Sequence, residues 1–71
     1  MNANEILFSY NNTRCHAVIV SPLLIESNAD LSNAIKNPNR YIGEIDGYDI
    51  YSFSAMFHQF GFFAIKKGAK I

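Results

Sequence analysis

Apolar and polar residues alternate between positions 41 and 65, and the alternation is interrupted at Asp46 and Gly47. A period of two is typical of β-strands, because successive side chains point to opposite faces of a sheet. An Asp-Gly pair between two such runs favours a type I′ turn, which needs positive φ at both central residues. The pattern therefore predicts a β-hairpin at the centre of the chain, with a further strand at about Phe62 to Lys66.

Two registers of this hairpin are compatible with the pattern. A two-residue loop at Asp46 and Gly47 would place Glu44 opposite Asp49, and like charges in opposed positions destabilise a strand pair. A four-residue loop from Asp46 to Asp49 avoids that contact and is slightly favoured. Both registers give the same faces, because they differ by an even number of residues. One face carries Tyr41, Gly43, Ile45, Tyr48, Ile50, Ser52, Ser54 and Met56, and the other carries Arg40, Ile42, Glu44, Asp49, Tyr51, Phe53, Ala55 and Phe57.

A second hairpin is predicted near the amino terminus. Two alternating runs, Glu5 to Tyr10 and Thr13 to Val20, flank an Asn-Asn pair that can supply the positive φ angles of a tight turn. A two-residue loop collects the better core residues on one face, which places Arg14 and His16 on the outside. The predicted inner face consists of Ile6, Phe8, Tyr10, Thr13, Cys15, Ala17 and Ile19.

One short helix is predicted between the hairpins. Ser21 followed by Pro22 matches a capped helix start, because proline at the first helical position loses no hydrogen bond. A second possible start is at Ser27, with Asp30 at the spacing of a capping box. We favour one helix from about Ala29 to Lys36, with or without a preceding turn from Pro22. The Asn-Pro-Asn sequence at positions 37–39 ends it.

The predicted order of elements is β-β-α-β-β-β. The fold class that follows is α+β, a small antiparallel β-sheet of about five strands with one short helix packed on one face. The segment from Ser54 to Gln59 fits either a turn between the last two strands or a single helical turn. The residues expected to be largely buried are Phe8, Ile19, Leu31, Ile35, Ile45 and Ile50.

Length and composition indicate a single domain, residues 1–71, close to the smallest size for which one hydrophobic core suffices. The single cysteine, Cys15, excludes an intramolecular disulfide and fits a reducing compartment. The longest apolar region, at positions 17–25, is too short to span a bilayer, and the first residues lack a signal-peptide pattern. We therefore expect a cytoplasmic protein without membrane association.

Charge is balanced overall but unevenly placed. The six basic and six acidic residues cancel. Glu44, Asp46 and Asp49 gather at the tip of the central hairpin and are called the charged tip. Two interpretations stay open, since these carboxylates either keep the tip soluble or steer a basic partner. Because no face has the excess of Lys and Arg that phosphate binding requires, no direct nucleic-acid binding is expected.

Two histidines allow one catalytic hypothesis. His16 and His58 would act as general acid and base in a small ribonuclease-type toxin, with Arg14 or Arg40 holding the phosphate. Nothing in the spacing brings the two imidazoles together, and the neutral chain lacks a basic groove. Cys15 and His16 are adjacent on a strand, so they point to opposite faces and do not form a metal site. We expect no metal and no cofactor.

Aromatic residues supply the best signal of a contact surface. The chain has six Phe and four Tyr, more than so small an interior is expected to hold, and neither face of the central hairpin is polar throughout. The interface candidates are Tyr51, Phe53, Phe57, Phe60 and Phe62. The last strand is expected at an edge of the sheet with its aromatic middle unprotected, which predicts a symmetric homodimer anchored by Phe62.

These patterns favour a non-catalytic protein-binding module. Its small size and neutral charge resemble those of small phage- or mobile-element-type inhibitors that block the surface of a host defence enzyme. This analogy rests on size and charge and not on particular residues. Two alternatives stay open: a ribonuclease-type toxin that uses His16 and His58, and a structural subunit of a larger assembly. An enzyme is the less favoured interpretation.

Overall fold

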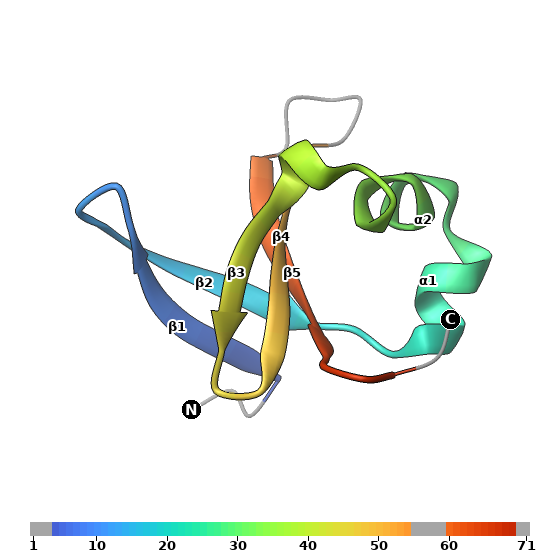
Figure 1. Ribbon diagram of the computed structural model, residues 1–71, viewed down its shortest axis with the longest axis horizontal. Helices are drawn as coiled ribbons and strands as arrows, with labels where there is room; N and C mark the ends of the chain where they lie inside the picture. The colour runs from blue at the N-terminus through green and yellow to red at the C-terminus, as the bar shows by residue number, and fades with distance from the viewer. Residues whose placement is uncertain (1–3, 55–59, 70–71) are drawn as a thin grey trace.

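Five strands form one curled sheet in the spatial order β1-β2-β5-β4-β3, with two short helices packed against one side (Figure 1). The computed structural model describes residues 4–54 and 60–69. The strands are β1 (Glu5–Tyr10), β2 (Thr13–Ile19), β3 (Tyr41–Ile45), β4 (Tyr48–Ser54) and β5 (Phe60–Lys66). The helical elements are α1 (Pro22–Ser27), α2 (Ala29–Ile35) and the 3-10 turn η1 (Pro38–Arg40).

The predicted α+β class and the five strands are confirmed, but the sheet is mixed and not antiparallel. β2 and β5 run parallel, with Ala17 opposite Phe62, whereas the other neighbouring strands are antiparallel. The last strand thus lies between β2 and β4, and the prediction that it forms an edge is wrong. Its side chains are apolar on both faces, as expected for a strand covered on both sides.

Two helices replace the single predicted one, because Asn28 interrupts the helical segment. Its extended backbone, with ψ of 111°, ends α1, while its side-chain oxygen accepts hydrogen bonds from the backbone N–H groups of Asp30 at 3.0 Å and Leu31 at 3.1 Å. Asn28, not Ser27, therefore caps α2. The predicted cap at Ser21 is confirmed, since its Oγ accepts a hydrogen bond from the Leu24 N–H at 3.2 Å.

The central hairpin has the two-residue turn, so the favoured four-residue loop is wrong. Asp46 and Gly47 have φ angles of 53° and 83°, and Glu44 lies directly opposite Asp49. Each carboxylate has a partner that offsets the repulsion. Lys67 Nζ lies 3.1 Å from Glu44 Oε1, and the Tyr41 hydroxyl donates a hydrogen bond of 3.1 Å to Asp49.

A bulge in β3 changes the predicted faces at two positions. Tyr41 pairs with Tyr51 and Gly43 pairs with Ile50, so Ile42 is an extra residue on β3. Tyr41 consequently joins the face of Tyr51, and Ile42 joins the opposite face, the reverse of the prediction. Gly43 has a φ of 151°, which residues with a side chain rarely adopt.

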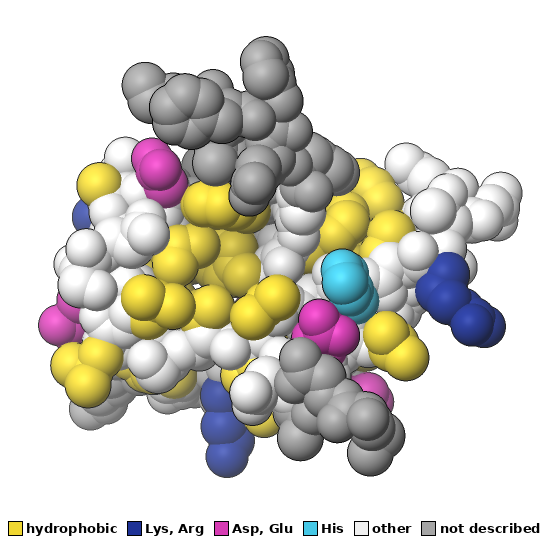
Figure 2. Space-filling model, turned by 180° about the vertical axis from the view of Figure 1, so that it is seen from behind, with side chains coloured by type: hydrophobic (Ala, Val, Ile, Leu, Met, Phe, Trp, Pro, Cys, Tyr) yellow, Lys and Arg dark blue, Asp and Glu magenta, His cyan; other side chains and the backbone are white. Residues whose placement is uncertain are grey.

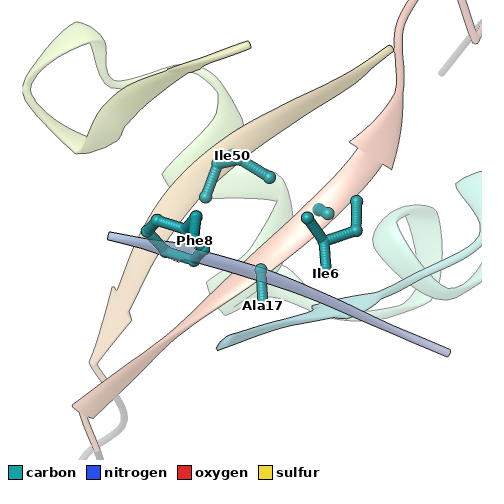
Figure 3. Close-up of a cluster of buried hydrophobic side chains, with 5 residues drawn as sticks. Ile6, Phe8, Ala17 and Ile50 are labelled. Carbon is teal, nitrogen blue, oxygen red and sulfur yellow. The ribbon is translucent and has the colours of Figure 1, made fainter. Parts of the chain in front are cut away.

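Two hydrophobic clusters lie on opposite faces of the sheet. In the first, Ile6 and Phe8 of β1 and Ala17 of β2 pack with Ile50 of β4 and Ala64 of β5 (Figure 3). The curl of the sheet brings the β1–β2 hairpin over β4 and β5. The second cluster joins the helices to the sheet and contains Ile25, Leu31, Ala34, Phe63 and Ile65.

Three of the six residues predicted to be largely buried are buried in the structure. Phe8, Leu31 and Ile50 are buried, with Ile50 fully enclosed. Ile19, Ile35 and Ile45 are half-buried at the margins of the two clusters, because the small sheet offers few fully enclosed positions. None of the helices in the described part of the chain is long and apolar enough to cross a membrane.

Candidate protein-binding surface

The two edges of the sheet, β1 and β3, differ in how well they are protected. β3 is five residues long, is interrupted by the bulge, and follows directly on η1. β1 is regular over six residues and is paired with β2 along its whole length. Bulges and short strands protect an edge from pairing with another chain. Of the strands described, β1 therefore has the more open edge.

The hairpin register determines which main-chain groups face that edge. Tyr10 and Thr13 flank a two-residue turn formed by Asn11 and Asn12, whose φ angles of 52° and 61° match the prediction. In such a hairpin, alternate opposed pairs exchange hydrogen bonds, beginning with the pair next to the turn. The even-numbered residues of β1 therefore bond to β2. The odd-numbered ones, Glu5, Leu7 and Ser9, direct their N–H and C=O groups away from it.

The same odd-numbered residues place their side chains on the outer face of the hairpin. We call this the hairpin surface, and it consists of Glu5, Leu7, Ser9, Arg14, His16 and Val18. Two of its members are large, apolar and open to solvent, since Leu7 is 67% exposed and Val18 is 46% exposed. In Figure 2, apolar side chains lie beside charged ones and a histidine at the side of the molecule that β1 and β2 form.

Leu7 takes part in two shallow depressions. One is lined by Leu7, Phe8, Ser9 and Arg14. The other is lined by Leu7, Arg14, Cys15 and His16. An exposed leucine beside concave surface offers both a side chain that a partner can cover and a hollow that a partner side chain can fill.

Charged groups surround this apolar centre. His16 Nδ1 lies 3.4 Å from Glu5 Oε2, with the imidazole 63% exposed and the carboxylate side chain 25% exposed. Arg14 is exposed beyond Ser9, its partner in the register. The outward orientation predicted for Arg14 and His16 is thus confirmed, and Leu7 has polar groups of both signs around it.

The catalytic hypothesis receives no geometric support at His16. Its described neighbour is the carboxylate of Glu5, and His58 lies outside the described residues. Cys15 is half-buried, and its Sγ lies 3.5 Å from the Thr13 carbonyl oxygen. In residues 4–54 and 60–69 there is no group of three His, Cys, Asp or Glu side chains that could hold a metal ion.

The aromatic interface candidates take part in internal packing wherever they are described. Tyr51 stacks on Phe63 at 5.5 Å between ring centroids, and Phe53 meets Phe63 edge-on at 6.0 Å. Phe62 is half-buried and packs edge-on against Phe8 at 5.1 Å. The structure thus places these three rings in the two clusters and not on an open face. Phe57 and the side chain of Phe60 lie outside the described residues.

The charged tip is partly compensated by the carboxyl-terminal segment. The Lys67 backbone N–H bonds to the Gly47 oxygen at 3.0 Å, which holds Lys67 beside the turn. The hydrogen bond to Glu44 raises the pKa of Lys67, and the nearby Asp49 adds to the effect. Desolvation and the hydrogen bond to Asp49 raise the pKa of Tyr41. Asp46 remains exposed at the turn. Lys67, near the carboxyl end of the sequence, therefore lies beside the charged tip.

Two further depressions lie beside the helices. One is polar and is lined by Asp30, Asn33, Ala34, Asn37, Arg40, Ser52 and Phe53. The other is a shallow groove lined by Ile35, Lys36, Asn37, Pro38, Tyr41, Asp49, Tyr51 and Lys67. The groove contains the contact of Tyr41 with Tyr51, whose ring centroids are 5.3 Å apart. Neither combines an exposed aliphatic side chain with an open strand edge, as the hairpin surface does.

Leu7 and Val18 were absent from the residues expected at an interface. The signal for them was present in the sequence, because both are apolar positions on the predicted outer face of the first hairpin, beside Arg14 and His16. Comparison with protein-family models, curated proteins and solved structures found no match to this chain.

Proposed function

We propose that the protein is a non-catalytic protein-binding module that docks on its partner through β1 and the hairpin surface. The proposal rests on Leu7, whose side chain is 67% exposed at the middle of an open edge strand and lines two shallow depressions. An exposed apolar side chain on an unpaired edge costs solubility, and natural proteins usually place charges or proline there. A binding role would account for an exposed leucine at this position.

The binding mode that fits this edge is strand addition. A partner strand laid beside β1 would receive hydrogen bonds from the main-chain groups of Glu5, Leu7 and Ser9. Covering Leu7 would contribute about 1.5–3 kcal/mol from its apolar surface. Arg14 and His16 would then select partners by charge and by hydrogen bonding.

The finer form of the proposal is a small phage- or mobile-element-type inhibitor that occupies the surface of a host defence enzyme. Its support is the format of the chain, a neutral protein of 71 residues. In this form the protein acts by blocking a surface, and strand addition on β1 would supply the contact. The charged tip has a smaller part in this account, because Lys67 and Tyr41 already engage two of its carboxylates.

A pull-down with matched leucine variants tests the proposal. Leu7→Arg places a charge on the hairpin surface, whereas Leu23→Arg places the same charge on α1, where the side chain is 77% exposed. From an extract of the cell that produces the protein, we expect a partner that wild type and Leu23→Arg retain and that Leu7→Arg loses. A partner retained equally by all three proteins would refute docking through β1. Circular dichroism spectra of both variants confirm that the fold is intact.

A further inference from the structure

We infer that the strand added to β1 is β1 of a second copy of the chain, paired antiparallel about a twofold axis that passes through Leu7. This inference rests on the proposed function, because it names the occupant of the same edge. The result is one continuous sheet across two copies, with the hairpin surfaces side by side. A closed twofold pairing leaves no further open β1 edge and so does not propagate into a fibre.

The direction of the main-chain groups permits this register. With the axis at Leu7, the two Leu7 residues face each other, and Glu5 of each copy faces Ser9 of the other. These are the residues whose N–H and C=O groups point away from β2, as the register of the β1–β2 hairpin shows. Each opposed pair of this kind exchanges two hydrogen bonds, so the three pairs would exchange about six.

The charges along β1 complement each other in the same register. Ser9 lies opposite Arg14 within the hairpin and would lie opposite Glu5 of the second copy. Arg14 and that glutamate are then two strand spacings apart, about 9.5 Å, on the same face. Because only the small Ser9 side chain stands between them, the two long side chains can meet above it. The twofold axis repeats this contact between Arg14 and Glu5, so the dimer contains it twice.

Registers shifted by two residues lose these matches. With the axis at Ile6, Leu7 faces the charged Glu5 of the second copy. With the axis at Phe8, Leu7 faces Ser9 and remains apart from its symmetry mate. The Leu7-centred register is thus the one of the three that covers both leucines with each other and brings opposite charges together. The short polar-apolar-polar pattern at Glu5, Leu7 and Ser9 is itself symmetric about Leu7.

Disulfide trapping tests the register directly. In a Cys15→Ser background, Leu7→Cys would place two cysteines opposite each other with Cα atoms about 5.5 Å apart, within the range of a disulfide. Mild oxidation should give a covalent dimer on a non-reducing gel. The control is Leu23→Cys in the same background, because Leu23 is more exposed than Leu7 but lies on α1. Equal trapping of the two variants at matched concentration would overturn the inference.

A mixing experiment tests whether Glu5 of one copy lies opposite Ser9 of the other. Glu5→Cys and Ser9→Cys, each in the Cys15→Ser background, should crosslink with each other several-fold more than either does with itself. Homodimers of the single variants in excess over the mixed dimer would contradict the Leu7-centred register. Mass spectrometry separates the three products.

A variant that leaves the side chains of Leu7 and Glu5 in place gives an independent test. Ser9→Pro removes an N–H that points to the open edge, and proline is tolerated on edge strands at such positions. Sedimentation over a concentration series should show dimers for wild type and loss of association for Ser9→Pro, with similar melting temperatures. Monomers for wild type at every concentration, or dimers untouched by Ser9→Pro, would overturn the inference.

The oligomeric state and the pull-down together distinguish the β1–β1 dimer from docking of another protein on β1. If wild type is monomeric while the pull-down still shows a Leu7-dependent partner, the second copy is refuted and docking through β1 stands. If wild type is monomeric and Leu7→Arg loses no partner, docking through β1 is refuted as well.

Discussion

Truncation of Ile50 to alanine should remove a large part of the stability of the fold. Ile50 is fully buried on β4, where it packs with Ile6 and Phe8 of β1 and with Ala17. Losing its methyl and methylene groups costs the transfer free energy of those groups, about 0.8 kcal/mol each, plus a cavity contribution, for a total of about 3–4 kcal/mol. A domain of 71 residues has a free energy of unfolding of about 4–11 kcal/mol. Ile50→Ala therefore removes about a quarter or more of it.

Urea unfolding followed by circular dichroism measures this loss. With a slope of about 1–1.5 kcal/mol per molar urea for so small a domain, the midpoint should fall by about 2–4 M. The matched control is Leu23→Ala, which removes a side chain of equal size that is 77% exposed on α1. It should change the free energy of unfolding by less than about 0.5 kcal/mol. A loss below about 1 kcal/mol for Ile50→Ala would refute the assignment of Ile50 to the cluster under β1.

Three further variants test local features of the fold. Gly47→Ala should lower the free energy of unfolding by about 1 kcal/mol, which thermal melting measures. Gly47 has a φ of 83°, a backbone conformation that is strained for any residue with a side chain, although an added Cβ would meet no neighbouring atom. Asn28→Ala removes the oxygen that accepts two N–H groups of α2 and should cost about 1 kcal/mol in urea unfolding. Lys67→Met should destabilise the protein in low salt but less in high salt, since it leaves the opposed Glu44 and Asp49 without their cation. Because the pKa of Lys67 is raised above 10.5 on folding, its contribution is complete below pH 10.5 and is lost as pH rises through the folded value, so wild type and Lys67→Met should converge there.

The chemistry of both turns and the cap of the first helix were readable from the sequence because they are local. The Asn-Asn and Asp-Gly pairs adopt the positive φ angles that their residue types tolerate, and Ser21 caps α1 as predicted. The prediction of a four-residue loop at the central hairpin was wrong because it considered the repulsion between Glu44 and Asp49 within two strands alone. Lys67, distant in sequence, lies 3.1 Å from Glu44 and offsets that repulsion, and no local pattern reveals this contact.

The strand order could not be predicted from the pattern of single strands. β5 pairs with β2 in parallel and with β4 antiparallel, which requires the chain to return between two strands formed earlier. One sequence signal pointed this way, since β5 is apolar on both faces. Because β5 is covered on both sides, Phe62 and Phe63 pack in the two hydrophobic clusters, and the predicted anchor Phe62 contacts Phe8.

The candidate surface was partly visible in the sequence. The outer face of the first hairpin was assigned correctly, with Arg14 and His16 exposed. What the pattern could not supply was the edge position of β1, and without it Leu7 reads as an ordinary exposed apolar residue, which is common on protein surfaces. The open edge together with the exposed leucine is what makes this surface a candidate.

Amide hydrogen exchange at the edge of β1 shows whether a partner adds a strand there. In dilute protein, the N–H groups of Leu7 and Ser9 should exchange quickly, because they point away from β2, whereas that of Phe8 should be protected by its pairing with Cys15. On association, with a second copy at high concentration or with the protein retained in the pull-down, we expect exchange to slow at Leu7 and Ser9. Unchanged exchange at both amides in the associated state would contradict strand addition on β1.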